Sequence, residues 1–163
     1  MSRVLVELLY GKNAHTDGRI CVDVNAETAS RRPERLPHSI WQLVWHMNYW
    51  MDYELERIGG SAPPYPEHAA LSWPSVEPPN SEAWPREAAR FGELVGRLEA
   101  LARRSPPELA RLVPSPDEKA GDAYPLEAVL WQTLVHNSYH LGQVVMVRQA
   151  LGAWPPEKGS DTW

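Results

Sequence analysis

The sequence has very little cysteine. Cys21 is the single one among 163 residues, which excludes an intramolecular disulfide framework. The fold must therefore be held by its apolar core, and a chain of this length is long enough to bury one. A reducing compartment is the simplest home for such a chain, so we expect a cytoplasmic protein. The length predicts a single domain over residues 1–163, with an irregular tail over 153–163.

Long apolar runs and an excess of positive charge are also missing. No segment approaches the roughly 18 consecutive apolar residues of a membrane span. The first residues, MSRVLVELLYGKNAH, lack the basic start and long apolar centre of a signal peptide. The formal net charge is −5, the wrong sign for phosphate backbones or anionic membranes, and the densest basic run, RRPER at residues 31–35, includes a glutamate. We expect neither a nucleic-acid partner nor a membrane partner.

Alternating strand patterns and internal repeats are absent, whereas helical periodicity is strong and 16 prolines punctuate it. Ser39 and Gln42 have the spacing of a capping box and predict the start of a helix that ends at Gly59 and Gly60. The main helices are expected over residues 2–10, 39–58, 81–104 and 125–151, with a further helical stretch within 13–32 and long links over 61–80 and 105–124. These elements predict an all-α fold, a four-helix bundle with long crossover connections.

The last predicted helix carries two histidines, His136 and His140, on a face that should be buried. Residues four apart project from the same side of a helix, and imidazole is the commonest metal ligand in proteins. Two core histidines can instead be satisfied by hydrogen bonds to Thr133, Gln143 or backbone carbonyls. The pair alone therefore leaves a metal site and a purely structural role open.

A third histidine, His46, lies in the helix predicted over residues 39–58, at the border of its apolar stripe. If the two helices pack across a core, one imidazole from the first helix can meet two from the last. Three histidines leave positions for water or substrate, which is the arrangement of catalytic sites. Asp52 and Glu56 fall on the opposite side of their helix and are poor ligand candidates. The sequence therefore predicts a divalent metal site made of His46, His136 and His140.

Two stretches, LPHSIWQLVWHMNYW (residues 36–50) and HNSYHLGQVVMVRQALGAWPP (residues 136–156), together resemble a known family. Their order, the single histidine in the first and His-x-x-x-His-x-Gly-Gln in the second are similar to the DinB-like (DinB/YfiT) superfamily of bacterial four-helix metalloproteins. The resemblance covers nearly the whole chain. It implies a bundle with a divalent ion held by His46, His136 and His140, in a cytosolic homodimer. It also implies either a metal-dependent enzyme that uses a low-molecular-weight thiol or a hydrolase.

An ion at such a site offers two reactions: it can stabilise a substrate thiolate for transfer, or it can lower the pKa of bound water for hydrolysis. Hydrolysis needs a general base, and no carboxylate is expected beside the histidines, since Glu54 is two turns beyond His46 and Glu127 faces away. We therefore expect thiol transfer first and hydrolysis second. A non-catalytic metal-binding module, its shell closed by Glu67 or Glu77, is a third interpretation. Zinc and nickel are the preferred ions, while iron, copper and manganese are compatible.

Further residues are candidates for the same site. His15 lies in a loop and His38 just before a helix, and either could reach the ion as a catalytic group, although a surface role fits both. Gln143 stands one turn beyond His140, where it could orient a ligand or a bound water, so it is a candidate for both catalysis and the pocket. Trp50, one turn beyond the histidine of its own helix, is expected to wall the pocket.

The tryptophans also bear on assembly. Trp41 and Trp45 fall on the far side of the helix over residues 39–58, where a single chain would leave them in water. We expect loops or a second subunit to cover them, and we expect a homodimer. Trp73 lies in the first long link and is expected to help lock it. Gly142, inside the last helix, either lets a neighbouring backbone approach closely or serves helix packing alone.

Overall fold

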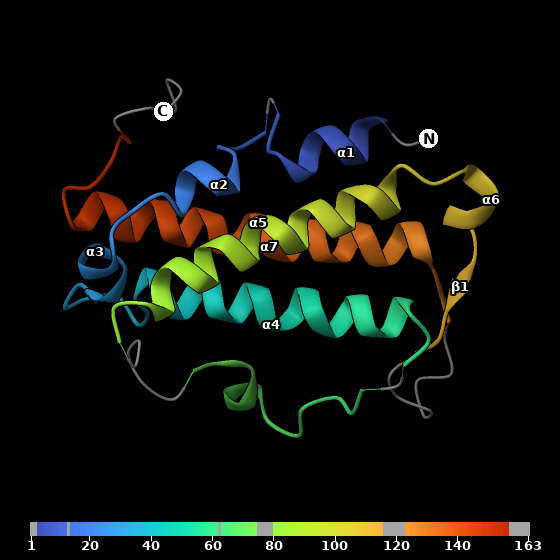
Figure 1. The fold of residues 1–163 in the computed structure, drawn as a ribbon, viewed down its shortest axis with the longest axis horizontal. Helices are drawn as coiled ribbons and strands as arrows, with labels where there is room; N and C mark the ends of the chain where they lie inside the picture. Colours follow the sequence, from blue (N-terminus) through green and yellow to red (C-terminus); the bar gives the residue numbers. More distant parts are fainter. Residues whose placement is uncertain (1–2, 13, 62, 75–79, 116–122, 157–163) are drawn as a thin grey trace.

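A computed structural model of the chain describes residues 3–12, 14–61, 63–74, 80–115 and 123–156. The all-α prediction is confirmed. Three long helices lie side by side along the molecule: α4 (Ile40–Ile58), α5 (Ala83–Ala102) and α7 (Leu126–Ala150) (Figure 1). α4 packs against both others, so its buried residues are spread around most of its circumference. None of the described helices combines the length and apolar character needed to cross a membrane.

Short helices of the N-terminal segment complete the bundle. α1 (Arg3–Leu9) and α2 (Gly18–Cys21) both contact α5 and α7, whereas α3 (Ala26–Ser30) contacts α4 and α5. The single helical stretch expected within residues 13–32 is wrong, because this region forms two separate helices. Asp17 caps α2 by accepting a hydrogen bond from the Arg19 N–H, and Asn25 caps α3 through the Thr28 N–H. Each cap begins a new helix, so the direction of the chain changes between them.

The start of α4 follows the sequence prediction. The Ser39 hydroxyl accepts from the Gln42 N–H, and the Gln42 side chain accepts from the Ser39 N–H at 3.0 Å, which completes the capping box. The helix ends at Gly59, and Gly60 has a positive φ of 95°. A well-defined start matters here because it sets the rotation of α4 and hence the direction in which His46 projects.

The first long link crosses the bundle. α4 and α5 run in the same direction, so the chain returns along the whole length of α4 before α5 begins (Figure 1). A short 3₁₀ helix, η1 (Ala69–Ser72), packs against α4 in the middle of this link. α7 runs antiparallel to α4. The crossing therefore carries Ser72 and Trp73 to the middle of α4, at the level of His46.

The second long link stays at one end of the bundle, where α5 ends and α7 begins (Figure 1). It contains a helical turn, α6 (Pro106–Leu109), and a short antiparallel pair of strands that the sequence does not predict. Leu112 of β1 (Leu112–Val113) pairs with Pro125 of β2 (Tyr124–Pro125). Strands of two residues are too short to show an alternating pattern, so they cannot be predicted from the local sequence.

The outer side of α4 is covered within the chain. Trp41 is only 5% exposed and belongs to the apolar core, and Trp45 is half-buried. The Asn48 side chain, 1% exposed, donates hydrogen bonds to the Glu87 backbone and carboxylate of α5. The expectation that Trp41 would be wet in a single chain is therefore wrong, because α5 packs on that side of α4.

Candidate metal centre

Three histidines meet between α4 and α7. His46 comes from α4, and His136 and His140 from α7; one ring nitrogen of each lies within 4.8 Å of the others. The ring centroids are 5.2 Å apart for His46 and His136, and 4.6 Å apart for His136 and His140. His46 and His140 are 6% and 7% exposed, and His136 is half-buried. The convergence expected from the sequence is present, and no carboxylate or thiolate joins this cluster among the described residues.

Hydrogen bonds fix the orientation of two of these rings. Nδ1 of His46 lies 2.7 Å from the backbone oxygen of Ser72, and Nδ1 of His140 lies 2.7 Å from Oε1 of Gln143. Both oxygens accept, so both Nδ1 atoms carry the proton, and each Nε2 atom presents a lone pair. The position of Gln143 beside His140 follows from the helical spacing. Ser72 was missed by the sequence analysis, because a backbone carbonyl on a crossing link leaves no signature in side-chain type.

The third ring shows that the cluster fits a cation. Nε2 of His136 lies 3.3 Å from Nε2 of His46, while the buried Nδ1 of His136 has no hydrogen-bond partner among the described residues. Whichever nitrogen of His136 carries its proton, one lone pair or one N–H group in this cluster is unsatisfied. Two nitrogens bound at about 2.0–2.1 Å to one tetrahedral ion lie about 3.4 Å apart. The distance between the Nε2 atoms of His46 and His136 is therefore close to that between two ligands of one divalent ion.

The charge state of the cluster also suits a cation. Burial, which outweighs the opposing hydrogen bond to Ser72, lowers the pKa of His46 to about 4. Burial likewise lowers the pKa of His136 and of His140. All three imidazoles are therefore neutral at pH 7, and neutral imidazole is the form that binds metal ions.

The crossing link closes one side of the cluster. The Trp73 indole is stacked between two imidazoles, with ring centroids 3.9 Å from His46 and 3.9 Å from His38 and nearly parallel planes. Trp73 thus locks the link, as expected. His38 is separated from the three ligands by the thickness of this indole, so the structure does not bring it to the centre of the cluster.

The opposite side opens into a pocket of about 320 Å³. It is lined by Trp50, Glu54, Tyr65, Gln132, Thr133 and His136. Trp50 walls the pocket, with its ring centroid 6.4 Å from that of His136 and 5.5 Å from that of Tyr65. No carboxylate of the described residues lies in the histidine cluster itself, as expected, but Glu54 borders the same pocket as His136. The signal was present in the sequence: positions 46, 50 and 54 follow one another at helical spacing along α4.

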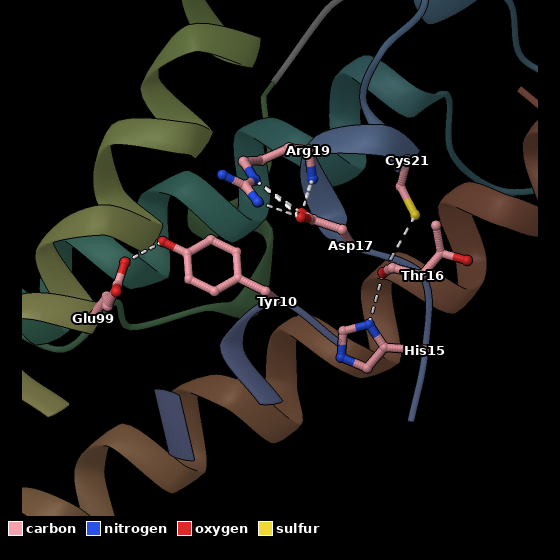
Figure 2. Close-up of polar contacts among 7 residues, drawn as sticks. All are labelled: Tyr10, His15, Thr16, Asp17, Arg19, Cys21 and Glu99. Carbon is pink, nitrogen blue, oxygen red and sulfur yellow. Dashed lines mark hydrogen bonds and ion pairs between the residues drawn. The ribbon is translucent and has the colours of Figure 1, made fainter. Parts of the chain in front are cut away.

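His15 is held elsewhere. Its Nδ1 lies 2.8 Å from the Thr16 backbone oxygen, and its Nε2 lies 3.1 Å from the Ser138 hydroxyl. Ser138 is two residues from each histidine of α7 and therefore projects from the other side of that helix. Figure 2 shows His15 beside Thr16, whose backbone oxygen also faces the Cys21 thiol. Burial raises the pKa of Cys21 to about 12, so this thiol is not a nucleophile at neutral pH.

Three further residues were candidates for the site: Glu67 and Glu77 as metal ligands, and Gly142 as a point of close approach. Glu67 is exposed and is not part of the histidine cluster, and Glu77 lies outside the described residues. At Gly142, an added Cβ would meet no atom within 4 Å, so no neighbouring backbone of this chain approaches it closely. The packing of α7 within the chain thus gives no reason for the glycine.

Comparison with known proteins identifies the family. Searches of curated proteins and of solved structures gave no match. The family model of the DinB superfamily matches residues 19–144, a range that contains all three histidines and Gln143. This match extends over more than half of the chain and agrees with the helical architecture and with the position of the histidine cluster. The chain belongs to the DinB superfamily.

Proposed function

We propose that the protein binds one divalent metal ion through His46, His136 and His140, and that it is an enzyme that activates a small thiol for transfer to a small electrophile. The observation that carries this proposal is the open side of the cluster. Three neutral imidazoles, two of them oriented by hydrogen bonds, converge without a further ligand atom from the described residues, and a pocket lined by His136 adjoins them. A divalent ion bound there would supply the Lewis acidity that lowers the pKa of a thiol or a water molecule. Zinc or nickel fits three imidazoles best, while iron, copper and manganese are compatible.

Other residues around the cluster orient the imidazoles and shape the pocket. Gln143 and the Ser72 carbonyl hold two imidazoles in the productive tautomer. Trp73 excludes water from the face of His46, and Trp50 offers an apolar wall to the substrate. No side chain has to supply a nucleophile in this scheme, because the substrate thiol is the nucleophile.

The position of Glu54 favours thiol transfer over hydrolysis. Glu54 is eight residues from His46, about 12 Å along the axis of α4. Both of its carboxylate oxygens also accept hydrogen bonds from Arg57, at 2.8 and 3.1 Å. A base at that distance is badly placed to take a proton from a group bound at the histidines. Hydrolysis remains the second candidate, since Glu54 does border the pocket, and a non-catalytic metal-binding module is the third.

Metal content and thiol chemistry test the proposal together. Protein purified without a histidine tag should contain about one divalent ion per chain, and His136→Ala should lose it. The metal-loaded protein should consume a low-molecular-weight thiol in the presence of a generic electrophile. Turnover of esters or amides without added thiol would instead support hydrolysis. Stoichiometric metal with neither reaction would leave the binding module.

A further inference from the structure

The pocket beside the histidines has one polar end and two aromatic walls. Trp50 from α4 and Tyr65 from the crossing link form the walls, while Glu54 and Gln132 lie farther from the cluster. The side chain of Gln132 is exposed, whereas that of Glu54 is 18% exposed. Glu54 supplies the one carboxylate among the described residues that line the pocket.

Arg57 forms an ion pair with the Glu54 carboxylate. The side chain of Arg57 is 7% exposed and does not line the described part of the pocket. Its Nε atom donates to the Pro114 carbonyl at 3.2 Å, and its NH1 atom donates to both oxygens of Glu54. The guanidinium group of Arg57 is therefore buried in the protein, and the carboxylate of Glu54 is the member of the pair that borders the pocket. A carboxylate oxygen can accept more than one hydrogen bond, so each one still has capacity for a donor from a ligand.

The histidine cluster and Glu54 are a fixed distance apart, because His46 of the cluster and Glu54 both belong to α4. His46 and Glu54 are separated by about 12 Å along the helix axis. A molecule that reaches both must have a metal-binding group at one end, a slender body that packs against Trp50 and Tyr65, and a second polar group at the other end.

From this arrangement we infer that Glu54 is a specificity determinant that selects substrates whose far end carries a protonated amine. The ammonium group donates to the Glu54 carboxylate, the body lies along the surface that the two contacting aromatic rings form, and the other end reaches the histidine cluster. The inference rests on the proposed function only for the group that binds at the histidines, which is a thiol in that proposal. The amine at the other end of the substrate is inferred from Glu54 alone. An aromatic wall adds to the selection, because the face of an indole attracts cations.

Ligand binding to the cobalt(II)-loaded protein tests this inference without any turnover. Thiolate binding to cobalt gives a charge-transfer absorption, which can be titrated. Three thiols of similar length are compared: aminohexanethiol, mercaptohexanol and mercaptohexanoate. The wild-type protein should bind the amine about tenfold more tightly than the alcohol and should bind the carboxylate most weakly. Cysteamine, which is too short to reach Glu54, should show no such advantage.

Variants at Glu54 isolate the carboxylate. Glu54→Gln should reduce the preference for amine over alcohol to less than about threefold, and Glu54→Asp should retain most of it. Removing one partner of a buried pair can destabilise the fold, so Glu54→Gln combined with Arg57→Met provides a variant without an unpaired charge. Glu56→Gln is the matched control, because Glu56 is an exposed glutamate of the same helix that borders a different pocket.

The outcomes separate the two proposals. Equal binding of amine and alcohol by the wild type, or a preference unchanged in both Glu54→Gln variants, overturns the role of Glu54. If no thiol binds, the proposed thiol chemistry fails. The same comparison is then made with aminohexanohydroxamate and hexanohydroxamate, which bind divalent ions through oxygen. Tighter binding of the amine-bearing hydroxamate by the wild type, lost in Glu54→Gln, supports the inference. Equal binding of the two hydroxamates overturns it.

Discussion

Single hydrogen bonds decide which nitrogen two of the three imidazoles present to the centre of the cluster. His140 depends on Gln143 and His46 on the Ser72 carbonyl, and each contact leaves Nε2 free to bind an ion. One of these contacts could be predicted from the sequence, since Gln143 stands one turn beyond His140 on the same helix. The other could not, because it joins two segments that are distant in the sequence. The position of Glu54 could be predicted from its helical spacing with His46 and Trp50, whereas the contact of Tyr65 from the crossing link with Trp50 could not.

Replacing Gln143 should weaken metal binding without unfolding the protein. Gln143→Leu removes the acceptor of the His140 Nδ1–H group, and loss of such an orienting contact costs about 10- to 100-fold in metal affinity. Gln143→Glu keeps an acceptor and should bind zinc at least as tightly as the wild type. Competition with a chromophoric chelator measures both. Gln149→Leu, an exposed position on the same helix, is the control. Equal affinities for Gln143→Leu and this control would contradict an orienting role.

The metal-free protein should lose stability as the pH falls from about 6.5 toward 4. The pKa of His46 is lowered to about 4 in the folded chain, from 6.5 in an unfolded one. Between these values the unfolded chain binds a proton that the folded chain does not, so the free energy of unfolding decreases as the pH falls. The lowered pKa values of His136 and His140 act in the same direction.

Urea unfolding of chelator-treated protein at pH 7 and pH 5 measures this effect. His46→Gln should show a smaller change between the two pH values than the wild type, because one titrating group is gone. An identical change in both proteins would show that His46 does not carry a lowered pKa.

Among the secondary-structure elements, those with their own local signals could be predicted and those shaped by contacts could not. α4 and α5 have apolar periodicity over four or more turns, and α4 also has its capping box. α7 is apolar on more than one face, so its length rather than its periodicity identifies it. α2 and α3 are single turns set by Asp17 and Asn25, and their separation reflects packing against different helices. The crossing link has no periodicity at all. The sequence predicted a long link with Trp73 locking it, but only the fold shows that Trp73 and Ser72 of this link contact the histidine cluster.

The crossing link should therefore contribute to both stability and metal binding through Trp73. Trp73→Ala removes a ring that is stacked between His38 and His46, and we expect a loss of about 2 kcal/mol in the free energy of unfolding. Because His46 also loses a wall that orients it, zinc affinity should fall. Trp73→Phe keeps a stacking ring and should recover most of both quantities. Chemical unfolding and chelator competition measure them. A Trp73→Ala variant with wild-type metal affinity would show that the link covers the site without shaping it.

At the scale of the whole molecule, one face of α7 is apolar and exposed. Val135, Tyr139 and Met146 are 62%, 65% and 57% exposed, and they follow one another at helical spacing with Gly142 between them. No Asp, Glu, Lys or Arg lies between Glu127 and Arg148, so this face lacks the charges that normally keep a helix in water. The original reason to expect a homodimer fails, since Trp41 is buried in its own chain. The α7 face provides a better one.

We predict that two copies of the chain pair through this face of α7. A two-fold axis places the same stripe of each copy against the other, which suits a surface without charge, and Gly142 allows the two helices to approach closely. The wild type should sediment as a dimer at micromolar concentration, and Tyr139→Glu together with Val135→Glu should give a monomer with its helix content unchanged. Glu127→Gln at the start of the same helix is the control. A wild type that is monomeric, or a double variant that stays dimeric, would contradict this interface. Because the ring of Tyr139 lies 5.0 Å from that of His140, the monomeric variant should also show whether pairing supports the metal centre, through its zinc affinity.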